Sequence, residues 1–306
     1  MKREGGFALI AVLLVMAMVG VIGAEFAYSM RLEAASVRAY KDALIGAHLA
    51  EAAVEQAIRE IAGEGAFVAV DDDGLLTFYA RDRRPLKRLP RDTVALGGGH
   101  FTYRLTDEEA RLNLNTASPD RVSRLLEALG IDKIERDTII ASIQDWRDPN
   151  ENHRLNGAES DDTYLELPVP YRSKNANLDS VNELVQIKGV TPALLKGVDD
   201  TPGLAEVVTV KSRGQVNINT AGPAVLRALG ISDAEYTEIV QSRRELPYAT
   251  VGRFGNRGLS VTTQTFRIEA EGILDGHVRA RITAIVQKRT DSGTETVAVL
   301  EWSGVQ

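Results

Sequence analysis

Residues 5–24 read GGFALIAVLLVMAMVGVIGA, and every one of them from Phe7 to Ala24 is apolar or glycine. A helix of about 20 such residues spans the hydrocarbon core of a bilayer, which is about 30 Å thick. The stretch therefore predicts a membrane-spanning helix. Lys2 and Arg3 lie just before it. Because positive charges stay on the cytoplasmic side, we expect a cytoplasmic N-terminus, with the bulk of the chain across the membrane.

The helical pattern continues beyond this span. Residues 30–61 contain no proline. Apolar residues recur there at spacings of three, four and seven, as on one face of a helix: Tyr40, Leu44, Ala47, Val54, Ile58 and Ile61. One continuous helix at 1.5 Å per residue would be on the order of 80 Å long. The alternative is a secretory signal peptide cleaved after residues 21–24, an imperfect cleavage site, and the continuing helix argues against it.

The composition limits the classes of function. With 44% hydrophobic residues among 306, the chain can build ordinary cores. Its net charge of -7 disfavours nucleic acid and anionic lipid as partners. The absence of cysteine excludes disulfides, a thiolate nucleophile and sulfur-ligated metals. Four scattered histidines, with no nucleophile elbow, phosphate loop or zinc-protease motif, predict that the chain is not an enzyme.

Alternating apolar stretches flank a long helical region. Strands are expected at residues 66–70, 75–79 and 100–106, with a turn at residues 71–74. From residue 107 to about 258 the period is helical, with helices expected at residues 121–129, 134–143 and 181–187. After the helical region, apolar residues again occur at every second position, as in strands. They form three stretches: Phe266, Ile268 and Ala270; Val278, Ala280, Ile282, Ala284 and Val286; Ala298, Leu300 and Trp302. The pattern predicts strands that are interrupted by a helical insert.

The N-terminus resembles that of type IV pilins and pseudopilins. A short basic leader ends in Gly5-Gly6 and is followed by Phe7 and an apolar run, as in the class III signal of that family. The resemblance implies that a prepilin peptidase cuts after Gly6, that Phe7 becomes an N-methylated N-terminus, and that the helix packs against others in a filament. An ordinary single-pass anchor remains the alternative.

Within that family the chain resembles the K-type minor pseudopilin of type II secretion systems. Most pilins carry a glutamate at the fifth mature position, where this chain has Ala11. A buried carboxylate is costly without a cationic partner, so its absence suits a subunit with no neighbour above it. The most specific matches are residues 145–148, 154–159, Tyr164, 170–172 and 180–184.

The resemblance implies an α+β fold, in which a long N-terminal helix packs on an antiparallel sheet interrupted by a large helical insert, SAM-like or helix-hairpin-helix-like. The expected parts are a leader (1–6), the helix (7–62), the first part of the sheet (63–106), the insert (107–258) and the second part of the sheet (259–306). The implied location is the bacterial inner membrane, with a single pass and a periplasmic bulk. The implied partners are I-type and J-type minor pseudopilins, the major pseudopilin, the prepilin peptidase and the inner-membrane assembly platform. The implied role is nucleation and capping of the pseudopilus tip for protein secretion.

The insert contains an internal repeat. Residues 112–117 (LNLNTA) with 129–131 (LGI) are echoed by residues 216–221 (VNINTA) with 229–231 (LGI), and residues 188–191 add a third similar turn. The pattern resembles helix-hairpin-helix modules, so a membrane-anchored DNA-binding protein for DNA uptake is the alternative function.

Two features of the repeat argue against that alternative. The second glycine of the phosphate-binding turn is replaced each time, by Asp132, Thr191 or Ser232. Residues 107–200 also carry 19 acidic and 11 basic side chains, which would repel a polyanion, and no nucleic acid is expected as a partner. The simpler interpretation is that Asn115 or Thr116 caps a helix and orders the turn.

An acidic loop in the insert has the spacing of a calcium site. Counting from Asp148, oxygen-bearing side chains fall at positions three, five, nine and twelve: Asn150, Asn152, Asn156 and Glu159. Asp161 and Asp162 follow closely enough to contribute. The resemblance also implies calcium in this domain, and we expect a structural Ca²⁺ site with Asp148, Asn150, Asn152, Glu159, Asp161 and Asp162 as candidate ligands. His153 stands where a calcium loop usually has glycine, and a solvated acidic loop is the alternative.

Overall fold

The computed structural model describes residues 5–63, 65–71, 73–199, 201–291 and 294–304. Residues 1–4 of the expected leader lie outside the described residues, as does Asp72 in the turn expected at 71–74.

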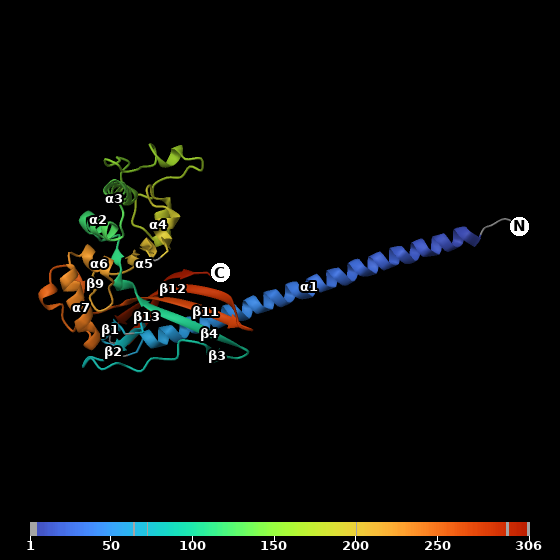
Figure 1. Ribbon diagram of the computed structural model, residues 1–306, viewed down its shortest axis with the longest axis horizontal. Helices are drawn as coiled ribbons and strands as arrows, with labels where there is room; N and C mark the ends of the chain where they lie inside the picture. The colour runs from blue at the N-terminus through green and yellow to red at the C-terminus, as the bar shows by residue number, and fades with distance from the viewer. Residues whose placement is uncertain (1–4, 64, 72, 200, 292–293, 305–306) are drawn as a thin grey trace.

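A single helix, α1 (Gly5–Ile61), carries the N-terminal part of the chain. It confirms the expectation of one continuous helix, and its first half projects far from the rest of the molecule (Figure 1). Its apolar beginning has the length and composition to cross a membrane, and no part of that apolar window is buried in the protein. Tyr40 and Leu44 of the expected apolar stripe are exposed, because they lie on a face of α1 that points away from the sheet.

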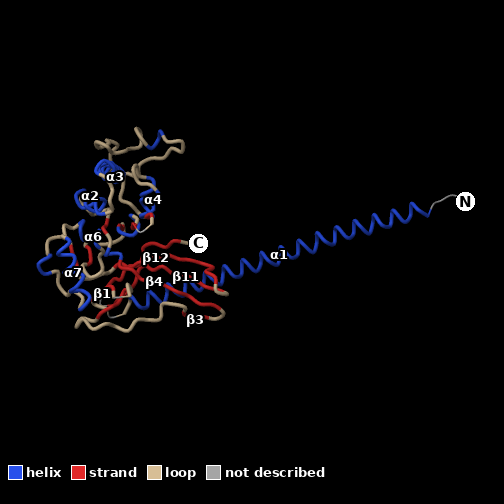
Figure 2. The backbone as a smooth tube through the Cα atoms, in the orientation of Figure 1, coloured by secondary structure: helices blue, strands red, loops and turns tan. Residues whose placement is uncertain are grey.

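Five antiparallel strands form the main sheet, in the order β13-β12-β11-β4-β3. The strands are β3 (Val94–Leu96), β4 (Gly99–Asp107), β11 (Thr265–Leu274), β12 (His277–Asp291) and β13 (Thr294–Ser303). Phe101, Tyr103 and Leu105 are buried on one face of β4, as their alternation predicts. The C-terminal part of α1 lies along these strands in Figure 2. The α+β pilin-like arrangement is thus confirmed.

Small residues let α1 approach the sheet closely. Its buried face consists of Leu49, Ala50, Ala53, Val54, Ala57 and Ile61. Gly46 on α1 and Gly272 on β11 meet where the backbones come nearest, and a Cβ on Gly272 would collide with the carbonyl oxygen of Gly46. Glycine is therefore required by space at this crossing, since no side chain fits between the two backbones.

The first part of the sheet differs from the expectation for residues 63–106. Strands β1 (Phe67–Val70) and β2 (Leu76–Tyr79) form where strands were predicted, but they pair with each other as a separate hairpin outside the main sheet. Val68, Leu76 and Phe78 still bury their side chains in the core beneath α1. Alternation predicted the strands correctly, but it does not identify the neighbour with which a strand pairs.

The second part of the sheet also begins later than residue 259. Leu259 and Ser260 form the short strand β10, which belongs to the insert, and the main sheet resumes at β11. In the expected stripes, Val278 is 41% exposed and Trp302 is 44% exposed, whereas Ala280, Ile282, Ala284 and Val286 are buried. Trp302 lies on β13, which stands at one end of the strand order and pairs with β12.

The insert has its own hydrophobic core, separate from the core between α1 and the sheet. Its helices are α2 (Pro119–Ala128), α3 (Lys133–Arg147), α4 (Pro192–Lys196), α5 (Leu204–Val207), α6 (Pro223–Ala228) and α7 (Asp233–Glu245). The 3₁₀ turns are η1 (Glu108–Ala110), η2 (Tyr164–Glu166), η3 (Val181–Gln186) and η4 (Gly252–Phe254). The short strands are β5 (Leu112–Asn113), β6 (Gly197–Val198), β7 (Thr201–Pro202), β8 (Val208–Thr209), β9 (Val216–Asn217) and β10 (Leu259–Ser260).

Replacing Gly272 by alanine tests the close approach of α1. Because the new methyl group meets backbone, we expect the Gly272→Ala protein to lose about 1–3 kcal/mol of stability, or several degrees in Tm. The control is Gly98→Ala in the β3–β4 turn, where a Cβ meets nothing within 4 Å. Thermal melts of the two full-length variants in detergent that show equal Tm values would contradict the close packing of α1.

Candidate functional site

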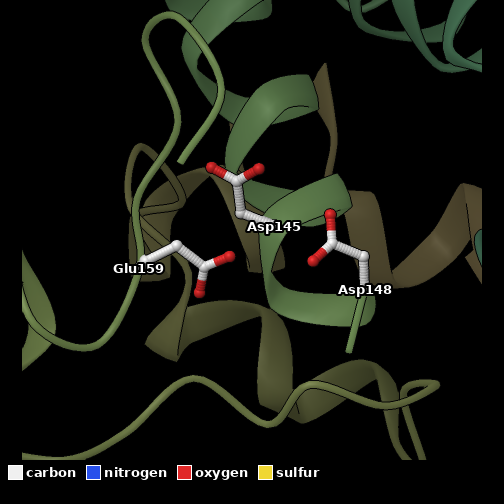
Figure 3. Close-up of side chains that lie close together, drawn as sticks. All are labelled: Asp145, Asp148 and Glu159. Carbon is white, nitrogen blue, oxygen red and sulfur yellow. The ribbon is translucent and has the colours of Figure 1, made fainter. Parts of the chain in front are cut away.

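Three carboxylates gather at the end of α3. Asp145 and Asp148 lie on and just after its last turn, and Glu159 reaches toward them from the following loop (Figure 3). One ligand oxygen from each lies within 4.8 Å of the others. Asp145 and Glu159 are buried. The cluster thus joins a helix end to a loop that runs on to Tyr171, which stacks on Tyr164.

The cluster is short of positive charge. The Arg154 guanidinium contacts Asp145 at 2.6 Å and also contacts Asp148. Glu159 receives a hydrogen bond from the Ser173 hydroxyl at 2.8 Å, but its Oε1 atom is buried with no hydrogen-bond partner in the described residues. Burial and the nearby negative charge of Asp145 raise the pKa of Glu159 to about 7. Three carboxylates facing one guanidinium, with one oxygen unsatisfied, fit the oxygen-rich site of a divalent cation.

The structure brings together two of the six predicted ligands, Asp148 and Glu159. Asn150 instead donates from its amide side chain to Asp148, and Asn152 donates from its backbone to Asn150. Asp162 pairs with His153 and accepts a hydrogen bond from the backbone of Glu159. Asp161 is exposed and lies 3.8 Å from Arg172.

Sequence reasoning missed Asp145 as a candidate ligand. Its oxygens accept hydrogen bonds from the backbone of Arg154 and Ala158, which fold the loop back onto the helix. A signal was present, because Asp145 and Asp148 are three residues apart and so share a face of the last helical turn.

The internal repeat is a repeat of structure. Asn115 accepts from the backbone N–H of Leu178 and donates to its carbonyl, and Asn219 makes the same pair of hydrogen bonds with Tyr248. Arg147 donates to the Leu114 carbonyl, just as Arg243 donates to the equivalent Ile218 carbonyl. Each repeat therefore uses an asparagine amide to fix a distant loop, and an arginine of its last helix to fix the start of the repeat.

The prediction that Asn115 or Thr116 caps a helix is wrong. Ser118 occupies the N-cap of α2, and its side chain makes no capping hydrogen bond. Its counterpart before α6 is Gly222, which has no side chain to cap the helix. Both helices have proline at their start, which leaves one fewer backbone N–H to satisfy. Asn115 is unavailable for capping because its amide holds the loop at Leu178.

The three hairpin turns are capped by the residues that replace glycine. Asp132 accepts from the backbone of Ile134 and Glu135, Ser232 from that of Glu235, and Thr191 from that of Leu194. These amides are the groups with which a helix-hairpin-helix turn would bind phosphate. Since the chain's own oxygens occupy them, the turns do not favour binding of a nucleic-acid backbone.

Three consecutive buried acidic residues hold the insert on the sheet. Asp107 accepts hydrogen bonds from Asn217 and Thr220 of the second repeat and from Thr263 of the returning segment. Glu108 is paired with Arg111 at 2.6 Å and Arg267 at 2.8 Å. Sequence reasoning counted these charges as repulsive surface, yet they are internal.

The electrostatic states of the three acids differ. Burial raises the pKa of Asp107. Burial alone would also raise the pKa of Glu108, but Arg111 and Arg267 bring it below its ordinary value. For Glu109, burial and the adjacent charge of Asp107 raise the pKa to about 7.

The fold defines the class of protein. A long helix with a candidate membrane-spanning beginning, seated on an antiparallel sheet, is the architecture of pilin-like proteins, and a duplicated hairpin domain interrupts its sheet. Two family models, both described as type II secretion system protein K, match residues 104–200 and 216–269. Both stretches of the chain are therefore similar to type II secretion system protein K.

Relatives extend the similarity over the rest of the chain. The type II secretion system protein K of Pseudomonas aeruginosa is 29% identical, over 97% of this chain and 92% of that protein. The putative type II secretion system protein K of Escherichia coli K12 is 27% identical, over 83% of this chain and 79% of that protein. A chain of the solved GspK-GspI-GspJ complex from enterotoxigenic Escherichia coli has the same fold, with a TM-score of 0.64, 17% identity and coverage of 90% of this chain and 99% of that chain.

Replacing Glu109 by glutamine tests the electrostatics of the junction. Its pKa is raised from 4.5 to about 7 on folding. The folded state therefore binds more protons than the unfolded state in that window, and stability falls as pH rises through it. Between pH 5 and pH 7 the Tm of the Glu109→Gln protein should fall less than the Tm of the wild type. Glutamine resembles the protonated acid and does not ionise in that range. A matched change at the exposed Glu245 should leave the pH dependence unchanged, and an unchanged slope in Glu109→Gln as well would contradict the raised pKa.

Proposed function

We propose that the protein is a minor pseudopilin at the tip of a type II secretion pseudopilus, where it nucleates and caps the filament. Its role would be structural, with no catalysis. Similarity to the protein K family supports the secretion system, and the E. coli complex supports association with I-type and J-type minor pseudopilins. The major pseudopilin would then add below this cap, driven by the inner-membrane assembly platform.

The observation that carries the proposal is a second apolar face on α1. Beyond the predicted span, Phe26, Met30, Val37, Tyr40 and Leu44 recur at helical spacing and are all exposed. At 3.6 residues per turn this stripe is about 145° away from the face that α1 buries on its own sheet. Outside the membrane such side chains would be left in water, so neighbouring helices of other subunits are the natural cover.

The N-terminus fits the same assembly. Cleavage after Gly6 by a prepilin peptidase would make the methylated Phe7 the first residue of α1, in the inner membrane with the remainder in the periplasm. Ala11 then leaves no carboxylate to pair with the N-terminal amine of a subunit above it, and the insert occupies the space over the sheet (Figure 1).

We also propose a structural calcium ion at Asp145, Asp148 and Glu159. The support is the buried, unsatisfied Glu159 oxygen and the excess of carboxylates over cations. The ion would fasten the loop after α3, which has few buried apolar side chains of its own.

A charge on the second apolar face tests the assembly role. In a strain that lacks the native copy, the full chain should restore secretion, whereas Val37→Glu should not. Burying a valine is worth about 1.5–3 kcal/mol, so the tagged variant should also retain about tenfold less of the other minor pseudopilins. The control is Ala35→Glu, a charge on the opposite side of the exposed helix. Normal secretion in the deletion strain, or equal behaviour of the two variants, would contradict the proposal.

Thermal melts with and without calcium test the metal site. Calcium at about 100 times its Kd should stabilise the full-length protein by about 2.7 kcal/mol, and chelator should remove this gain. Glu159→Gln should abolish the gain without lowering the Tm in chelator, because the unsatisfied carboxylate is removed. The control Glu166→Gln, at an exposed residue of η2, should keep the gain in stability with calcium. Equal melting of the wild type in calcium and in chelator would exclude the site.

A further inference from the structure

The two hairpins of the insert have nearly the same turn. Leu129-Gly130-Ile131 and Leu229-Gly230-Ile231 connect α2 to α3 and α6 to α7. The φ angles of Gly130 and Gly230 are 81° and 79°, both in the left-handed region. The next helices begin at Lys133 and Asp233, so Glu135 and Glu235 are each the third residue of a helix. What lies against one turn can therefore be compared directly with what lies against the other.

The second hairpin is covered by an arginine of its own chain. Arg257 donates to the Gly230 carbonyl at 3.1 Å, and the same nitrogen lies 3.0 Å from the Glu235 carboxylate. Arg257 comes from the loop before β10, which pairs with the first strand of this repeat. One guanidinium thus satisfies both the open carbonyl of the turn and the carboxylate next to it.

The first hairpin has no such cover. Within the described part of the chain, no donor reaches the Gly130 carbonyl, and the Glu135 carboxylate forms no hydrogen bond or ion pair. The residue equivalent to Arg257, two positions before the partner strand β8, is Glu206, which cannot supply a guanidinium. The nearest cations on α3 are already engaged: Lys133 with Asp137, and Arg136 with Glu127.

A cavity of about 410 Å³ opens beside the uncovered turn. Leu129, Ile131 and Leu194 give it an apolar lining, and the charged residues that line it, Glu135 and Asp199, are both acidic. Val198, which lines the cavity, is 55% exposed, and Ile134, the neighbour of Glu135 on α3, is 80% exposed. A polyanion is disfavoured by both carboxylates, whereas a cationic side chain with apolar neighbours matches the lining.

We infer that this cavity binds an arginine-bearing segment of a partner protein, whose guanidinium takes the place at Gly130 and Glu135 that Arg257 takes at Gly230 and Glu235. Arginine suits this position better than lysine because its planar fork can donate to a carbonyl and a carboxylate together. The inference concerns the insert alone and does not depend on the tip position of the subunit.

Site-specific photo-crosslinking tests the inference in cells. A photoreactive residue replaces Val198 in the full chain, expressed in the secreting strain, and mass spectrometry identifies the crosslinked peptide. We expect a protein adduct whose peptide contains an arginine, reduced about tenfold by Glu135→Gln because a charged hydrogen bond is lost. The matched control Glu245→Gln, an exposed carboxylate on α7, should leave the adduct unchanged.

Several outcomes would overturn the inference. They are the absence of an adduct, an adduct to lipid or nucleic acid, an adduct to a peptide without arginine, and an arginine-containing adduct that Glu135→Gln does not reduce. Melting of the Glu135→Gln protein separates loss of binding from loss of folding. If that variant is destabilised, replacing the partner's arginine by alanine provides the same test on an unaltered insert, and retention of the adduct then counts against the inference.

Discussion

The whole molecule depends on one helix that must satisfy two different surroundings. An apolar helix keeps its backbone hydrogen bonds internal, so the beginning of α1 can lie in lipid without a partner. Its last turns pack against strands of its own sheet through glycine and alanine, which permit close approach. Between these two parts, α1 presents the exposed stripe that includes Met30 and Val37. The candidate anchor, the segment that packs in the core and the proposed surface for neighbouring subunits are therefore consecutive parts of one helix.

The insert adds a second unit without loosening this arrangement. The chain leaves the sheet at the end of β4 and returns to it before β11, and both connections contact the buried acids 107–109. Asp107, at the end of β4, accepts a hydrogen bond from Asn217 of the second repeat. Buried carboxylates are stable only with full hydrogen bonding, and here threonines, an asparagine and arginines provide it. The junction fixes the direction of the insert relative to α1, which a subunit at a filament end would require.

The parts of the fold that the sequence predicted rest on long or regular signals. The apolar run from Phe7 to Ala24 predicts a helix long enough to cross a membrane, and the alternation of Phe101, Tyr103 and Leu105 predicts a half-buried strand. The separate β1–β2 hairpin could not be predicted, because alternation carries no information about the pairing partner. The placement of Trp302 on an open edge escaped prediction for the same reason.

Polar residues were harder to place than apolar ones. In the sequence Asp145 has the pattern of an ordinary helix residue, but in the structure the following loop folds back and buries it. Asn115 has the pattern of a helix cap, but its amide is bonded to Leu178, 63 positions away. Glu108 belongs to a run that resembles solvated surface and is completely buried. In each case the role is set by residues distant in sequence, which local patterns do not contain.

Mass spectrometry of the tagged full chain, purified gently from membranes, tests the assignment most directly, because it reads both the N-terminus and the co-purifying proteins. A mature chain that starts at methylated Phe7 and retains I-type and J-type minor pseudopilins is the predicted result. An uncut N-terminus, or co-purification with DNA-uptake proteins, would contradict it.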